Sequence, residues 1–452
     1  MTGVSDDPRP TNQFQAFFRT EAAGGAVLVF CACAALAVAN SPWAGAYRHV
    51  LEMKVAVDGG GHALSLTVHQ WINDAIMAVF FLLVGLEIKR EVLAGELSSP
   101  RQAALPIAGA IGGMVVPALI YYVANGGGAG SHGWAIPMAT DIAFALGVLM
   151  LVAPRAPLGL KVFLAALAIV DDMGAVLVLA IFYTNAIAWS ALGIAGLFMV
   201  LLVALNLLRV QRLTPYLLVG VGLWYFVHAS GVHATIAGVL LAFAIPSKTR
   251  INAAQFSAEA RRALDAFDRG ETGDLLVLTS KGQQDAVFGL ERAAAAVTGP
   301  LLRLEHALHG FSAFVVMPWF ALSNAGVNLS AASGGQVTIA VILGLAVGKP
   351  LGITAAAVAA VRFRWASLPE GVTWTALHGC AWLAGIGFTM SLFIASVAFD
   401  TPALLDSAKV GILAGSLVSG VIGTIVIRRG TRADVRHAAI GTAARERVPQ
   451  QT

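Results

Sequence analysis

Four ionisable side chains lie inside apolar segments of this chain, where they could bind and release ions. Asp171 and Asp172 are adjacent within a run that is otherwise apolar over residues 162–183. Asp141 and Lys349 lie in two further apolar segments. A charged aspartate at the centre of a bilayer-length helix costs roughly 2.5–3.5 kcal/mol on insertion scales, so such residues usually face a wet cavity. We therefore expect these side chains to carry ion chemistry.

The chemistry open to the two adjacent carboxylates is competition between protons and a hard cation. Withdrawal from water and a neighbouring like charge both oppose ionisation, so the protons should leave in coupled steps. Sodium prefers carboxylate, hydroxyl and carbonyl oxygens. Neighbouring helical residues differ in direction by about 100°, so Asp171 and Asp172 can border one cavity without facing the same point. A site that holds protons or sodium, but not both, is sufficient for exchange.

Each of these residues also has a structural interpretation. Asp171 and Asp172 could form a buried salt bridge, and the segment around Asp141 could be a hydrated kink. Lys349 could balance the charge of an acid, balance exposed helix-end dipoles, or titrate itself. The choice depends on the elements that position these side chains.

The composition is that of a polytopic membrane protein. Of the 452 residues, 58% are hydrophobic and 12% are charged, and apolar runs of bilayer length recur along the chain. Lys and Arg gather in alternate loops, while the opposite loops carry almost none beyond Arg48 and Lys54. This asymmetry predicts about twelve spans with both termini in the cytoplasm. It also accounts for the net charge of +4 without a nucleic-acid partner.

The predicted organisation is all-α. It consists of a cytoplasmic amino-terminal tail (1–20), spans I–VIII (21–246), a cytoplasmic linker (247–303), spans IX–XII (304–427) and a cytoplasmic carboxy-terminal tail (428–452). Alternating residues on both sides of Asp58-Gly59-Gly60-Gly61 predict a short β-hairpin over 55–68, between spans I and II. Its exposed edge could pair with a second subunit, and a hydrated loop is the alternative.

Two spans are predicted to be interrupted. Span IV contains Pro137, Thr140, Asp141 and Gly147, and span XI contains Gly385-Ile386-Gly387-Phe388-Thr389. Discontinuous spans in corresponding positions of two halves indicate a binding site near the bilayer midplane. The spacing matches spans III–V with spans X–XII as inverted repeats, with broken helices IV and XI.

The motifs around these residues resemble those of the NhaA sodium/proton antiporters, over about residues 17–427. They are Thr140-Asp141 within Ala-Thr-Asp-Ile-Ala-Phe-Ala-Leu-Gly, Asp171-Asp172, Gly348-Lys349-Pro350-Leu351-Gly352, Gly231-Val232-His233-Ala234-Thr235, and Trp71-Ile72-Asn73-Asp74 running into Val84-Gly85-Leu86-Glu87. That family is itself a known example of inverted-repeat transporters, so the repeat is implied by the resemblance and is not an independent result.

The resemblance implies an electrogenic, pH-dependent exchanger that expels sodium or lithium against more than one incoming proton. It would serve pH and sodium homeostasis in the bacterial inner membrane and need no cofactor beyond the transported ions. By motif match, Asp171 and Asp172 carry protons and bind sodium. Thr140 and Asp141 lie at the crossing of the broken helices, and Asp141 and Lys349 balance opposed helix-end dipoles.

The same resemblance suggests roles outside this centre. The residues that it associates with pH response are Glu87, Lys89, Arg90, Glu91 and Glu305. Asp74 and His233 are further possible site residues, although a packing role is the simpler interpretation of His233. The expected partners are membrane lipid and a second copy of the chain, bound through the 55–68 hairpin.

Two alternatives would use similar residues. A sodium-coupled solute symporter could bind sodium through the same ligands, but sodium would not then displace protons from the purified protein. An intramembrane aspartyl protease also needs two acids, but in a Gly-x-Gly-Asp context, whereas Asp171 follows Ala168-Ile169-Val170. We therefore expect a transporter and not an enzyme.

Overall fold

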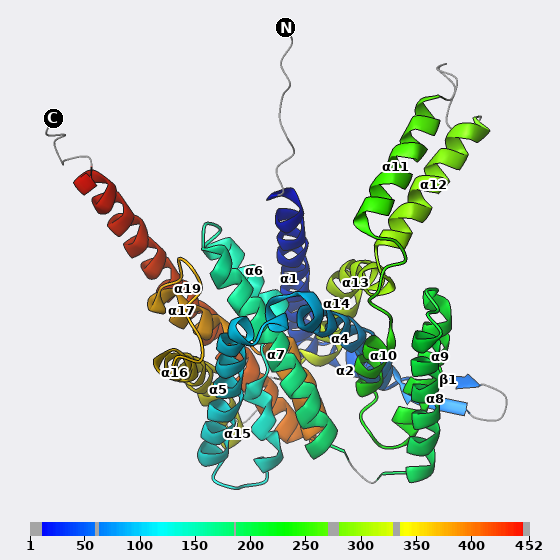
Figure 1. Cartoon of the computed structure of the whole chain (residues 1–452). Helices are drawn as coiled ribbons and strands as arrows, with labels where there is room; N and C mark the ends of the chain where they lie inside the picture. The colour runs from blue at the N-terminus through cyan, green and yellow to red at the C-terminus, as the bar shows by residue number, and fades with distance from the viewer. Residues whose placement is uncertain (1–10, 59–62, 185–186, 270–279, 329–334, 446–452) are drawn as a thin grey trace, which may run out of the picture. The chain divides into compact units, whose positions relative to one another are not determined.

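The computed structural model describes residues 11–58, 63–184, 187–269, 280–328 and 335–445. These residues are mostly helical, with one small antiparallel sheet (Figure 1). The chain divides into two compact units. The first comprises Met1–Phe80, Glu91–Ala186 and Gly310–Thr452, and the second comprises Phe81–Arg90 and Ile187–His309.

The first unit contains most of the helices. They are α1 (Thr11–Ala39), α2 (Ala44–Glu52), α3 (Val68–Gln70), η1 (Trp71–Ile76), η2 (Glu96–Ser98), α5 (Pro100–Asn125), η3 (Ser131–Met138), α6 (Ile142–Val152), α7 (Leu158–Phe182), η5 (Ser312–Val316), α14 (Met317–Asn324), α15 (Gln336–Leu343), η6 (Gly344–Gly348), α16 (Lys349–Arg362), α17 (Trp374–Ala384), α18 (Phe388–Ala398) and α19 (Pro402–Arg445). Helix α4 (Met77–Ala94) contributes to both units.

The second unit contains the remaining helices. They are α8 (Trp189–Leu207), α9 (Leu213–Ala229), α10 (Ile236–Ala244), α11 (Ala253–Asp268), α12 (Lys281–Val297) and α13 (Pro300–Phe311), whose last two residues belong to the first unit. Apolar side chains from α4, α8, α9, α10 and α13 form its buried core, including Leu86, Leu202 and Tyr216.

Seven described helical segments are long and apolar enough to cross a bilayer, and the number is nine if each of two bent pairs is one span. The seven are Val68–Ala94, Pro100–Asn125, Ser131–Val152, Leu158–Phe182, Trp189–Leu207, Gln336–Arg362 and Pro402–Gly430. The expected spans VII, VIII and IX fall on the shorter helices α9, α10 and α14. The protein is therefore a multi-pass membrane protein, while the number twelve stays a prediction.

Both predicted interruptions occur in the structure. The 3₁₀ helix η3 ends at Met138 and α6 begins at Ile142, so residues 139–141 lie outside both helices. Helices α17 and α18 are separated at residues 385–387 and differ in direction by 42°. Non-helical backbone is tolerated at membrane depth where protein surrounds it, and Ala139, Ile386 and their neighbours are buried.

The predicted hairpin is also present. Strand β1 (Lys54–Asp58) pairs with β2 (Ala63–Thr67) in antiparallel register, with Val55 opposite Leu66 and Val57 opposite Leu64. Its turn, residues 59–62, lies outside the described residues, as do residues 1–10 and 446–452 of the two predicted tails.

Glycines allow helices α5 and α16 to approach until their backbones touch. A Cβ added to Gly352 would lie 2.1 Å from the carbonyl oxygen of Gly112, and a Cβ on Gly112 would lie 2.2 Å from that of Gly352. Small residues permit this kind of contact between membrane helices. The contact lies one turn beyond Lys349, so it fixes the helix that carries this charge.

The predicted linker 247–303 is largely a helical hairpin. Helices α11 and α12 pack along each other (Figure 1). Each begins with a side-chain cap, from Asn252 and Ser280, as expected for helices that end in water. Ala286 and Ala293 are the buried residues of α12, and α11 has none, so the described part of this hairpin has little core of its own.

Candidate functional site

Asp141 lies at the interruption between η3 and α6, and its carboxylate caps two helices. Oδ1 accepts a hydrogen bond from the N–H of Phe144 in α6 at 3.0 Å. Oδ2 accepts from the N–H and the hydroxyl of Thr389, in the first turn of α18, at 3.2 and 2.5 Å. A helix N-terminus carries partial positive charge, so this carboxylate balances two half-helices at once.

Thr140 connects the other half-helix of span XI to the aspartate pair. Its hydroxyl lies 2.7 Å from Oδ2 of Asp171 and 2.9 Å from the carbonyl oxygen of Ala384, the last residue of α17. A hydroxyl donates one hydrogen bond at a time, so the two acceptors compete for it. Binding of a cation to Asp171 would favour donation to Ala384.

Lys349 supplies the positive charge of the site. Its Nζ lies 2.9 Å from Oδ2 of Asp171, with both side chains fully buried, and it also donates to the carbonyl of Met138 at the end of η3. It begins α16 directly after the π-helical turn η6. Wide turns of this kind frequently occur at functional positions. Lys349 therefore balances both an acid and the negative end of a half-helix.

Asp172 follows Asp171 on α7 and is 1% exposed. The charge of Lys349 interacts with both carboxylates. Oδ2 of Asp171 contacts both Thr140 and Lys349, whereas Oδ1 accepts no hydrogen bond from the described residues. An oxygen in that position could accept a proton or a cation, and the ion-carrying role of the two acids stays a prediction.

The structure thus brings Thr140, Asp171 and Lys349 into one buried network, and Asp141 and Asp172 adjoin it in the chain. No role was predicted for Thr389, which contributes two of the three hydrogen bonds to the Asp141 carboxylate. The available signal was its position, because a hydroxyl two residues after Gly387 stands at the start of a helix, where side chains cap. Ser391 was also missed, and its hydroxyl donates to the carbonyl of Ile136 in η3 at 2.7 Å.

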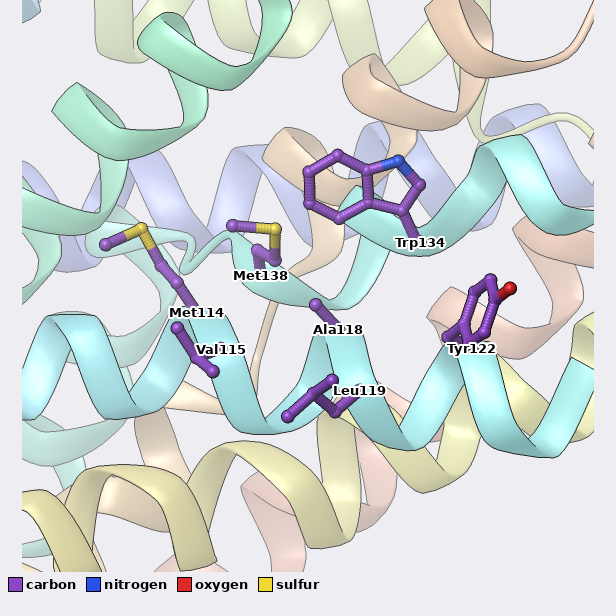
Figure 2. Close-up of a pocket in the computed structure, with 7 residues that line it drawn as sticks. All are labelled: Met114, Val115, Ala118, Leu119, Tyr122, Trp134 and Met138. Atoms are coloured by element: carbon purple, nitrogen blue, oxygen red, sulfur yellow. The ribbon is translucent and has the colours of Figure 1, made fainter. Parts of the chain in front are cut away.

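An apolar cavity of about 420 Å³ lies next to this network, between α5 and η3. Figure 2 shows the seven side chains that line it: Met114, Val115, Ala118, Leu119, Tyr122, Trp134 and Met138. The side chain of Met138 faces the cavity while its carbonyl accepts from Lys349. None of these seven residues carries a carboxylate.

The residues that the resemblance associated with pH response fall into two sets. In the second unit, Arg90 forms an ion pair with Glu305 at 3.3 Å, and Lys89 donates to the carbonyls of Phe243, at 2.7 Å, and Ile245 at the end of α10. Such donation caps a helix C-terminus. Glu87 lies half-buried on the same helix α4.

The remaining expected residues lie elsewhere. Glu91 accepts from the N–H of Glu96 at 3.0 Å within the first unit. Asp74 is half-buried in η1, also in the first unit. His233 belongs to the second unit, where its Nδ1 lies 2.8 Å from the hydroxyl of Thr235, a local contact that suits a packing role.

Comparison with known proteins gives consistent results. The model of the family described as Na+/H+ antiporter 1 matches residues 15–427. A protein named Na(+)/H(+) antiporter NhaA from Oleidesulfovibrio alaskensis is 48% identical over 429 residues, which are 93% of this chain and 95% of the relative. Another of that name from Acidithiobacillus ferrooxidans is 47% identical, over 91% of this chain and 96% of the relative. Na(+)/H(+) antiporter NhaA 2 from Helicobacter hepaticus is 44% identical, over 93% and 96%.

Proposed function

Because the chain belongs to the Na+/H+ antiporter 1 family, we propose that it exchanges sodium for protons across a membrane and is not an enzyme. The observation that carries this proposal is the state of Asp171. One of its oxygens pairs with Lys349 and Thr140, and the other accepts no hydrogen bond from the described residues. A buried acid with a removable counter-charge can take up a cation when that counter-charge is displaced.

The proposed exchange uses Asp171 and Asp172 as the shared site. In the resting arrangement Lys349 neutralises Asp171. Sodium would bind to the ionised carboxylates after their protons leave, with the hydroxyl of Thr140 and nearby carbonyls as further oxygen ligands. Two acids offer more than one proton per sodium ion, and this ratio makes the exchange electrogenic. Lithium, which prefers the same ligands, would follow the same route.

Asp141 has a different proposed role. Both of its oxygens are occupied by hydrogen bonds from α6 and α18. These bonds hold the carboxylate between the N-termini of two helices, where it is fixed by both. We infer that it holds the crossing of the broken helices together and does not carry the transported proton.

Competition at one site predicts that apparent sodium affinity rises with pH. Each proton that sodium displaces changes the affinity by up to about tenfold per pH unit, until the site is deprotonated. The measurement is sodium-dependent quenching and recovery of a pH-sensitive dye in everted vesicles, at several sodium concentrations over roughly pH 6–9, the range that buried carboxylates reach. A constant half-maximal sodium concentration over this range would exclude a shared site.

The alternative function, a sodium-coupled solute symporter, can be distinguished from an exchanger with purified protein, in the absence of any ion gradient. Sodium added to the purified protein in weakly buffered detergent solution should release protons from an exchanger. The Asp171→Asn protein is the matched control, because it loses the acid and keeps the side-chain shape. Sodium binding without proton release would favour symport.

We further propose the finer architecture and placement that the resemblance implies. The chain would have twelve spans with inverted repeats of spans III–V and X–XII, lie in the bacterial inner membrane and keep both termini in the cytoplasm. The broken spans at Asp141 and Gly385 and the basic loops support this arrangement. Response to pH through the region around Arg90 and Glu305 is supported by their ion pair.

A homodimer through the β-hairpin is proposed as well. A two-stranded sheet leaves an edge of unpaired backbone groups on each strand, and Val55 and Val57 are 42% and 54% exposed. The double substitution Val55→Asp and Val57→Asp would place like charges opposite each other where two hairpin edges pair. We therefore expect this variant to be monomeric in detergent by light scattering. Thr at both positions keeps the strand and should leave the dimer unchanged. A dimeric Asp variant would place the subunit contact elsewhere.

A further inference from the structure

The apolar cavity between α5 and η3 is open to the surface along one face of α5. On that face Val115 and Leu119 are 50% and 59% exposed, and Tyr122, one turn farther along, is 58% exposed. All three lie on a helix that is long and apolar enough to cross a bilayer. Large apolar side chains exposed on such a helix face hydrocarbon, so the mouth of the cavity opens to lipid and not to water.

The cavity has an interfacial end and a deep end. Figure 2 shows Tyr122 and Trp134 at the first and Met114 and Met138 at the second. Helix α5 ends at Asn125, so at 1.5 Å per residue Met114 lies about 16 Å from the end of the helix. The hydrocarbon core of a bilayer is about 30 Å thick, so the deep end lies near its middle. The cavity therefore extends through about one leaflet, which is the depth that an acyl chain occupies.

The two ends differ in polarity. Of the seven side chains that line the cavity, only those of Tyr122 and Trp134 carry an O–H or N–H group. Both can donate a hydrogen bond, and both ring types gather at the level of lipid head groups. The other lining side chains are aliphatic or thioether groups, which pack well against hydrocarbon. The cavity thus has donors where a lipid carries its ester and phosphate oxygens, and apolar walls where a lipid carries its chains.

Contacts with the end of α7 hold Trp134 in place. Its ring meets Phe182 edge-on, with centroids 5.3 Å apart, and lies tilted against Tyr183 at 6.4 Å. The hydroxyl of Tyr183 donates to the carbonyl of His132, two residues before Trp134 in η3. This wall of the cavity is therefore formed without a ligand. A preformed site loses less conformational entropy on binding, which favours a specifically bound lipid.

The deep end of the cavity adjoins the ion site. Met138 contributes its side chain to the cavity, while its carbonyl accepts a hydrogen bond from Lys349. Met114 covers Gly174 on α7, because a Cβ added to this glycine would collide with the sulfur of Met114. Gly174 follows Asp172 by two positions. A chain in the cavity would therefore pack against the residue whose backbone holds Lys349.

We propose that this cavity binds one acyl chain of a phospholipid, with Tyr122 and Trp134 donating hydrogen bonds to the oxygens where the chain meets the head group. Its volume of about 420 Å³ lies within the range of roughly 300–1,000 Å³ that is usual for small-molecule sites. The lining side chains carry no charge, so the chain and the ester region determine binding, and the head group does not. The proposal goes beyond ion exchange and does not depend on it.

Lipid retention by the purified protein tests the site. Phosphatidylethanolamine is titrated into the protein in a mild detergent, and the bound lipids are counted by native mass spectrometry. Ala118→Phe places a ring inside the cavity, so this variant should retain one lipid fewer than the parent. Leu197→Phe is the control, because it places the same ring on α8 at a position that is 67% exposed, and it should match the parent. An equal count in Ala118→Phe and the parent would overturn the proposal.

Photolabelling of the unchanged chain locates the lipid without a variant that has to fold. Phosphatidylethanolamine with a diazirine in one acyl chain is added to the protein in detergent and irradiated, and the labelled residues are identified by mass spectrometry. Residues 114–138 should carry several-fold more label than residues 193–207 of α8, and unlabelled phosphatidylethanolamine should compete. Equal labelling of both segments, or equal competition by hexadecane, which has the chain without the ester, would overturn the assignment to a phospholipid. Label that is present in monomers and absent from dimers would assign the cavity to a second subunit instead.

Discussion

Asp171→Asn and Asp172→Asn are each expected to abolish sodium-driven proton movement while the protein still inserts and folds. Asn matches Asp in shape but cannot carry the charge that binds sodium or releases a proton. Without that charge the site cannot couple sodium to protons, so we expect the exchange rate to fall to that of membranes without the protein. Asp171→Asn should be the more severe, because it also leaves Lys349 without its 2.9 Å partner.

The measurement is dye-reported proton movement in everted vesicles after sodium addition, with the amount of inserted protein determined in the same membranes. A matched control is Asp406→Asn, which changes a half-buried aspartate on a different helix, α19. Exchange at the parent rate in both site variants would exclude Asp171 and Asp172 as the carriers.

Gly352→Val is expected to prevent the first unit from folding. A Cβ at this position would lie 2.1 Å from the backbone oxygen of Gly112 and 2.9 Å from Cβ of Val116. Overpacked cores typically lose about 1–3 kcal/mol, and the cost here should exceed this range because backbone, which cannot rotate away, is in the path. We expect little folded protein in detergent by fluorescence-detected size-exclusion chromatography.

Gly196→Val on α8 is the control for this change. It introduces the same side chain into a membrane helix, but no heavy atom lies within 4 Å of its Cβ position. Its expression and elution should match the parent. Normal folding of Gly352→Val would mean that α5 and α16 can separate, and it would remove the restraint that we assign to the helix of Lys349.

The buried charges and the helix interruptions were easier to predict from the sequence than the number of spans. Asp141, Asp171 and Lys349 were recognisable because charges inside apolar runs need a reason, and the broken spans at Asp141 and Gly385 followed from residues that weaken helices. Spans VII to IX are less clear, because α9 and α10 are short and α14 continues through η5 from the more polar helix α13. In these segments the apolar composition favours a membrane span, whereas the helix is too short or too polar for a clear assignment.

Other features could not be predicted because they depend on contacts between distant segments. The hydroxyl of Thr389 is unremarkable in sequence, and only the fold brings it to Asp141, 248 positions away. The same holds for the hydrogen bond between Asn324 and Asn73, which lie 251 positions apart. The π-helical turn η6 before Lys349 has no sequence signature, since Gly-Leu-Ala-Val-Gly is compatible with an ordinary helix.

The double cap on Asp141 has a mechanical consequence. Since the carboxylate of Asp141 caps both α6 and α18, separating these two helices would leave a buried negative charge without its hydrogen-bond donors. Their N-termini therefore have to travel together, as a pivot, in any motion that exposes the ion site first to one side of the membrane and then to the other. Flexing should fall on the residues behind this pivot, at 385–387 in span XI and at Ala139 in span IV, which join it to the partner half-helices.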